Sequence, residues 1–114
     1  MSIDVRDGDG KSPAEIEAEL TGAGLHFLAL DVPPVENTAH WHDFSSVFYI
    51  TKGSVRLTDA TSGEVYDAQP GARVSVPARA LHAEKSATGY SILLGVTRDP
   101  ATFEDDVNLP PEDL

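Results

Sequence analysis

Apolar and polar residues alternate along most of this chain, and the period of the alternation changes near residue 25. Before that point Ile16 and Leu20 are four residues apart, as on one face of a helix. The residues that start and stop helices flank them: a Ser12-Pro13 cap, Glu15 three after the cap, and Gly22 or Gly24 at the end. We therefore expect one short helix near the N-terminus.

After residue 25 the period is that of strands, with every second residue apolar and turns rich in Gly and Pro between the segments. The expected strands cover residues 25–30, 47–50, 55–58, 64–68, 73–76 and 90–97. Many short strands at this spacing indicate an all-β fold, a small antiparallel β-barrel of the double-sheet kind. The helix is an accessory to it.

The length of 114 residues corresponds to one domain with a single modest core. Residues 1–11 are acidic and contain glycines, which predicts a flexible arm. Residues 12–97 form the expected barrel domain with its helix. Residues 98–114 are polar, acidic and contain several prolines, and they predict an irregular tail or one packed across another surface.

The formal net charge is −11. A field of this sign repels nucleic acid and anionic membrane surfaces, so neither is an expected partner. No apolar run approaches the roughly 20 residues that span a bilayer, and the acidic N-terminus is unlike a secretory signal. There is no cysteine, so thiolate and disulfide chemistry are excluded. Cytoplasm is the expected location.

Two histidines stand two residues apart directly ahead of an apolar run. His40 and His42 precede residues 47–50, and we expect the pair at the start of this strand. Side chains two apart in a strand share a face, so the two imidazoles can bind one transition metal. His82 is the candidate for the third ligand. The competing interpretation is a His-x-His pair that occurs by chance.

Further residues are candidates for the surroundings of this site. Phe44, Phe48 and Ile50 share the parity of the histidine pair and are expected either to line a pocket or to pack in the barrel core. Arg73 and Arg79 are candidates to hold a substrate carboxylate, with solvated surface positions as the alternative.

Glu84 and His26 are the remaining residues considered as metal ligands. Glu84 lies two residues after His82 and is the nearby carboxylate that we keep as a substitute ligand. His26 has a spacing to the pair that fits no ligand motif, and it is expected on the surface or at a sheet edge.

These features together resemble the two motifs of the cupin family over residues 39–86. The matching residues are the pair His40-Trp41-His42, the closing Gly53, the turn Pro70-Gly71, then Pro77 and His82. The resemblance implies a cupin barrel, also described as a jelly-roll-like double-stranded β-helix. It also implies a homodimer, since small members of the family commonly pair through their outer sheets.

The chain departs from the family pattern at three positions. Counting back from Gly53 puts the family's glutamate on Ser46, which is expected to face the metal without a carboxylate. Arg79 stands at a glycine position, and Ser86 at an asparagine position. The chain thus resembles the three-histidine cupins, which include thiol dioxygenases and diketone-cleaving dioxygenases with ferrous iron.

The resemblance leaves the metal open between Fe²⁺ and Zn²⁺, with Ni²⁺, Mn²⁺ and Cu²⁺ as alternatives, because three imidazoles suit all of them. The expected function is a metal-dependent, dioxygenase-like enzyme that acts on a small organic substrate. The alternative is a non-catalytic cupin that binds or senses a small molecule and holds a structural metal.

Overall fold

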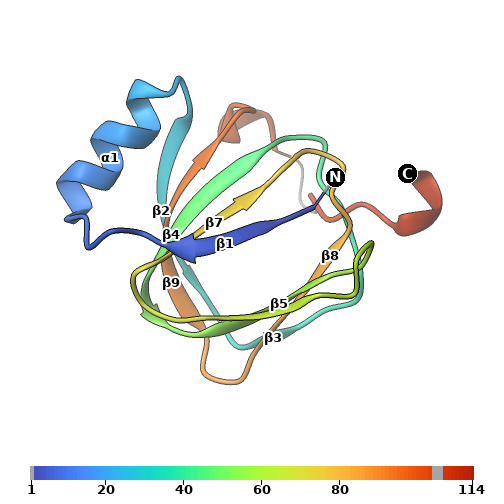
Figure 1. Cartoon of the computed structure of the whole chain (residues 1–114). Helices are drawn as coiled ribbons and strands as arrows, with labels where there is room; N and C mark the ends of the chain where they lie inside the picture. Colours follow the sequence, from blue (N-terminus) through green and yellow to red (C-terminus); the bar gives the residue numbers. More distant parts are fainter. Residues whose placement is uncertain (1, 104–106) are drawn as a thin grey trace.

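The computed structural model describes residues 2–103 and 107–114. Two antiparallel sheets face each other and enclose an interior (Figure 1). The larger sheet contains, in spatial order, β1 (Asp4–Asp7), β7 (Ala72–Val76), β4 (Ser46–Gly53), β9 (Tyr90–Val96) and β2 (His26–Val32). The smaller contains β3 (Val35–Glu36), β8 (His82–Ser86), β5 (Val55–Asp59) and β6 (Val65–Ala68). The predicted all-β fold of two sheets is confirmed.

The helix α1 (Pro13–Gly22) begins and ends where the sequence predicts. The Ser12 hydroxyl accepts from the Glu15 amide at 3.2 Å, and the Glu15 carboxylate accepts from the Ser12 amide at 3.0 Å. This capping box satisfies two amides that the first turn leaves without helical partners. Ile16 and Leu20 are buried, and they pack with Tyr49 on the outer face of the larger sheet (Figure 1).

Strand parity divides the side chains of the larger sheet between two clusters. On β4, Phe48 and Ile50 point into the core between the sheets, whereas Tyr49 points out beneath α1. On β7, Val74 and Val76 are buried in the core. One-residue steps therefore decide which side chains can reach the interior.

The arm predicted for residues 1–11 is not what the structure has at residues 4–7. These residues form β1, which pairs with β7 from Asp4↔Ser75 to Asp7↔Ala72. Ile3 is buried, and its amide donates to the Asp59 carboxylate at 3.2 Å. The acidic composition did not indicate this strand, because the pairing uses backbone groups of an edge strand that any residue carries.

The histidine pair was expected at the start of the strand that contains residues 47–50, and this detail is wrong. β4 begins only at Ser46. His40 and Trp41 instead form isolated bridges, with His82 on one side and with Leu109 on the other. The segment before β4 therefore lies between the start of β8 and the C-terminal tail.

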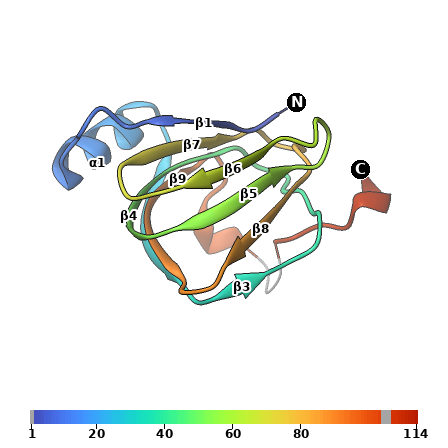
Figure 2. The same ribbon diagram turned by 60° about the horizontal axis from the view of Figure 1, so that its bottom comes forward.

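The C-terminal tail carries two single-turn 3₁₀ helices, η1 (Pro100–Thr102) and η2 (Pro111–Asp113). Figure 2 shows η2 and α1 at opposite ends of the molecule. Within the described part of the chain, no helix has the length and apolar character needed to cross a membrane.

Candidate metal centre

Two backbone hydrogen bonds bring the second histidine motif against the first. The His40 amide donates to the His82 carbonyl at 2.9 Å, and the His82 amide donates to the His40 carbonyl at 2.9 Å. Residues that exchange both bonds in an antiparallel pair lie directly opposite each other. His42 follows His40 by two residues and therefore also lies close to His82.

The three imidazole rings lie in one compact group. Ring centroids are 4.5 Å apart for His40 and His82, and 5.1 Å apart for each of the other two pairs. One nitrogen of each ring lies within 4.8 Å of the corresponding nitrogens of the other two. The predicted grouping of His40, His42 and His82 is thus present in the structure.

Backbone carbonyls fix the tautomer of every ring. The Nδ1 atoms of His40, His42 and His82 lie 2.8, 2.9 and 2.8 Å from the carbonyl oxygens of Thr38, Val107 and Ala80. A carbonyl can only accept, so each Nδ1 is the protonated nitrogen. The lone pair therefore resides on Nε2 of each ring, the form in which imidazole binds a metal.

The surroundings keep two of these rings neutral. Burial lowers the pKa of His42 below its ordinary value, against the hydrogen bond to the Val107 carbonyl. Burial, together with the neighbouring histidines, likewise lowers the pKa of His82, to about 4. Near neutral pH both rings are unprotonated, so a cation does not have to displace protons from them.

A cavity of about 410 Å³ adjoins the histidines. His42, His82 and Glu84 contribute to its wall, and the rest of the wall is mainly apolar. The apolar side chains come from both sheets and from the tail: Leu28, Leu30, Val32, Phe44, Phe48, Leu57, Val76, Ile92, Leu94, Val96, Phe103 and Val107. None of the described residues that line it is Lys or Arg.

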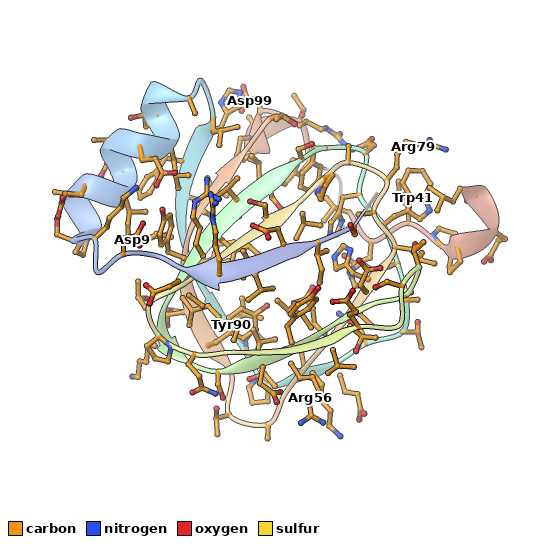
Figure 3. All side chains as sticks on the ribbon, viewed as in Figure 1. Asp9, Trp41, Arg56, Arg79, Tyr90 and Asp99 are labelled. Carbon is orange, nitrogen blue, oxygen red and sulfur yellow. The ribbon has the colours of Figure 1, made fainter. Side chains whose placement is uncertain are left out.

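Glu84 and Tyr90 are the other polar groups that matter in this wall. The Tyr90 hydroxyl donates to one oxygen of the Glu84 carboxylate, and the other oxygen lies 3.7 Å from Nε2 of His40. Figure 3 shows the Tyr90 side chain inside the barrel. Burial opposes ionisation of Glu84, but the surrounding contacts, among them the hydrogen bond from Tyr90, outweigh it and lower its pKa. The same burial raises the pKa of Tyr90, so its hydroxyl stays protonated.

The fold has relatives among solved structures. The chain is similar to a cupin superfamily protein from Desulfitobacterium hafniense, with a TM-score of 0.50 and 15% identity over 65% of this chain and 79% of that one. The TDP-quinovose 3,4-ketoisomerase of Campylobacter jejuni aligns with a TM-score of 0.57 and 14% identity over 77% and 71%. The oxalate decarboxylase of Bacillus subtilis aligns with a TM-score of 0.54 and 18% identity over 82% and 26%. The chain has the cupin fold. No family model and no curated protein matches the sequence.

The cupin interior receives some of the predicted pocket residues. Ser46, Phe44 and Phe48 line the cavity, and the Phe44 ring stacks on His42 with centroids 5.0 Å apart. Ile50 shares their parity but lies in the hydrophobic core, 1% exposed, where it packs and does not line the cavity. Of the two interpretations for these side chains, core packing applies to Ile50.

The two arginines considered for anion binding do not reach the cupin cavity. Arg73 lies on the outer face of β7, where its guanidinium pairs with Glu19 at 3.1 Å. Arg79 is exposed, and its guanidinium lies over the Trp41 ring at 5.3 Å, outside the barrel (Figure 3). Parity directs Arg73 outward, because its neighbours Val74 and Val76 alternate into the core. His26 is exposed at the start of β2 and is not a member of the cluster.

The residue types of the tail do not indicate what it does at this site. Val107 supplies the carbonyl that orients His42, and Leu109 pairs with Trp41. The Trp41 indole also donates to the Pro110 carbonyl at 2.8 Å. In each of these contacts the tail contributes a backbone group, so the residue types of the tail do not predict them. Tyr90 was interpreted only as part of a core strand, although its first position after a turn was the available signal for a polar role.

Proposed function

We propose that His40, His42 and His82 hold one divalent transition metal, and that this cupin is an oxygenase-type enzyme acting on a small, largely apolar organic molecule in the adjoining cavity. The observation that carries the proposal is the fixed tautomer of the three rings. Each Nδ1 donates to a carbonyl, so each ring carries its lone pair on Nε2, and the three rings lie close enough to share one cation.

The donor set fits a first-row transition metal. Three neutral imidazoles are ligands for Fe²⁺ and Zn²⁺, and for Ni²⁺, Mn²⁺ or Cu²⁺ in other geometries. We favour Fe²⁺ or Zn²⁺. When bound, such an ion supplies Lewis acidity, and ferrous iron adds the capacity to react with oxygen. Oxalate decarboxylase, one of the similar structures, has Mn(II) centres, which supports a metal in this fold.

The walls of the cavity determine what this chain can orient beside the histidines. Phe44 and Phe48 offer flat apolar surfaces, and Leu57 and Val76 add further apolar side chains to the wall. No Lys or Arg is among the described lining residues, so an anion finds no positive side chain there. We accordingly propose an uncharged, largely apolar substrate in place of the carboxylate considered for Arg73 and Arg79.

A second function is a non-catalytic cupin that binds or senses the same class of molecule and holds a structural metal. The composition of the cavity favours it, because Glu84 and Tyr90 are the main polar groups of the wall besides the histidines and Ser46. The ketoisomerase and the decarboxylase among the similar structures are enzymes, which supports the catalytic proposal. The homodimer stays a prediction.

The decisive experiment combines metal analysis with oxygen uptake. We expect about one equivalent of iron or zinc in the purified protein, and oxygen consumption by the iron form with uncharged diketones or phenols. His42→Ala should remove both the metal and the activity, whereas the exposed His26→Ala should keep both. Stoichiometric metal without oxygen consumption or product on this panel would favour the non-catalytic function. If the purified protein contains no metal and also binds none when metal is added, the proposed metal site is wrong.

A further inference from the structure

We propose that Glu84 is the fourth protein ligand of this metal, supplied by β8 in place of the carboxylate that Ser46 lacks. This inference rests on the three-histidine site proposed above. The metal centre then has three imidazole ligands and one carboxylate ligand. The carboxylate comes from β8 of the smaller sheet, whereas Ser46 lies in the larger sheet.

The backbone holds Glu84 firmly in position. Glu84 follows His82 by two residues on β8, so both side chains face the cavity. The Glu84 amide donates to the Asn37 side chain at 2.7 Å, and the Glu84 carbonyl accepts from the Asn37 amide at 3.1 Å. On the other side of the strand, Glu84 pairs with Leu57 of β5. The backbone position from which the Glu84 carboxylate extends is therefore fixed.

The two oxygens of the carboxylate have different neighbours. One accepts a hydrogen bond from the Tyr90 hydroxyl, and the other lies 3.7 Å from Nε2 of His40. Two donor atoms bound to one ion at about 2.0–2.2 Å lie about 3.0–3.5 Å apart. The 3.7 Å separation is slightly longer than this range, so ligation requires the Glu84 side chain to shift toward the histidines. Tyr90 then acts as a positioning residue that holds the other oxygen.

The charge of the cavity points the same way. The Glu84 side chain is only 20% exposed, and no Lys or Arg is among the described lining residues of the cavity that could neutralise it. A buried carboxylate is stable when hydrogen bonds and a nearby cation compensate its charge. Tyr90 supplies a hydrogen bond but no charge. A divalent ion among the histidines supplies the charge.

Ser46 completes the comparison, because it lines the same cavity and comes from the larger sheet. A serine hydroxyl carries no charge and is too short to replace a glutamate side chain. Glu84 reaches the cavity from the smaller sheet with both the charge and the length. Ser46→Glu should therefore compensate for the loss of Glu84.

The test is a titration of the purified protein with Zn²⁺ and Co²⁺, measured by competition with a chromophoric chelator and by the visible spectrum of bound Co²⁺. Glu84→Gln keeps the size of the side chain and removes its charge. We expect it to weaken metal affinity at least about 10-fold and to change the Co²⁺ spectrum. Azide should bind the Co²⁺ form more tightly, because the net charge of the site rises by one.

Two further variants and one control complete the design. Tyr90→Phe should weaken the metal by less than Glu84→Gln, and Ser46→Glu combined with Glu84→Gln should recover most of the lost affinity. Glu36→Gln removes an equal charge from an exposed glutamate, 73% exposed, and should change nothing. A crystal structure of the zinc-loaded parent protein should place a Glu84 oxygen about 2.0–2.2 Å from the ion.

The outcomes separate this inference from the proposed function. If Glu84→Gln binds Zn²⁺, Co²⁺ and azide as the parent does, Glu84 is no ligand and the three-histidine site stands. If the zinc-loaded structure shows Glu84 away from the ion, the same conclusion holds without any variant. If the parent binds neither metal, the proposed function itself is wrong.

Discussion

Two clusters of polar side chains, one outside the larger sheet and one between the sheets, show opposite ways of placing charge in this protein. In the outer cluster the carboxylate of Glu19 accepts hydrogen bonds from Tyr49, from Lys11 at 3.0 Å and from Arg73 at 3.1 Å. Two bases of the chain itself, Lys11 and Arg73, pair with this one acid. The outer cluster therefore fastens α1 to the sheet and needs no ligand.

The inner cluster consists of hydrogen-bond acceptors that lie close together. His40, His42 and His82 each use their proton on a backbone carbonyl and direct a lone pair inward, and the Glu84 carboxylate stands beside them. Described lining residues of the cavity include neither Lys nor Arg. The comparison teaches that a cluster whose acid is paired with bases of the same chain is structural, whereas converging acceptors with no Lys or Arg among the described lining residues are suited to a cation.

Removing an imidazole should have the largest effect on this comparison. His82→Ala leaves two ring ligands, and we expect metal affinity to fall roughly 1,000-fold, because each ligand contributes several kcal/mol to a structural or catalytic site. Loss of metal to a mild chelator measures it, with His26→Ala as control. Retention of the ion at the parent affinity would mean that the three rings do not share it.

The contribution of the outer cluster to the free energy of unfolding should depend on pH. Burial raises the pKa of Glu19, but hydrogen bonds from Tyr49, Lys11 and Arg73 outweigh it and lower the pKa to about 2. In the unfolded chain the group has its ordinary value of about 4.5. The stabilisation is therefore fully present above about pH 4.5 and is lost as the pH falls toward 2.

Glu19→Gln should lower the free energy of unfolding at pH 7 by roughly 1–2 kcal/mol, reduced from the full pKa shift because the side chain is 27% exposed. It should also flatten the decline between pH 4.5 and 2. Urea unfolding at several pH values measures both. Glu17→Gln on the exposed face of α1 is the control. An unchanged acid decline in Glu19→Gln would show that other carboxylates cause it.

Adding a carboxylate to the inner cluster tests its sign. Ser46→Glu should raise divalent metal affinity by about 10-fold and weaken the binding of small anions, since it adds a ligand and removes one unit of positive charge. Metal titration and azide binding to the Co²⁺ form give both numbers. If neither changes, residue 46 does not reach the ion, although it lines the cavity.

Arg79→Gly should have the smallest effect. Arg79 has a φ of 71°, a left-handed conformation that costs about 1–2 kcal/mol for a residue with a side chain. Glycine relieves this, but it gains about 0.5–1 kcal/mol of unfolded-state entropy and loses the contact with Trp41. We expect a change in unfolding free energy below about 1 kcal/mol and an unaltered metal affinity. A marked loss of metal would mean that Arg79 supports the centre.

The sequence by itself determined the features that depend on neighbours along the chain. The capping residues set the start of α1 at Pro13, and the alternation of apolar residues marked most of the strands. The glycine motif position Gly53 has a φ of 75°, and a side chain there would meet the Gly89 carbonyl at 2.4 Å. Such local periods and turns depend on backbone geometry alone, so they can be predicted from the sequence without knowledge of the tertiary structure.

Only the tertiary structure decided which distant groups meet. The spacing suggested that His40, His42 and His82 come together, but the carbonyls of Thr38, Ala80 and Val107 that choose their tautomers carry no mark in the residue types. A carbonyl is the same in every residue, so its role depends on where the chain crosses itself. The pairing of β1 likewise uses backbone groups. The contacts of Tyr90 with Glu84, and of Arg73 with Glu19 across 54 positions of sequence, join side chains, and the packing of distant elements decides which side chains meet.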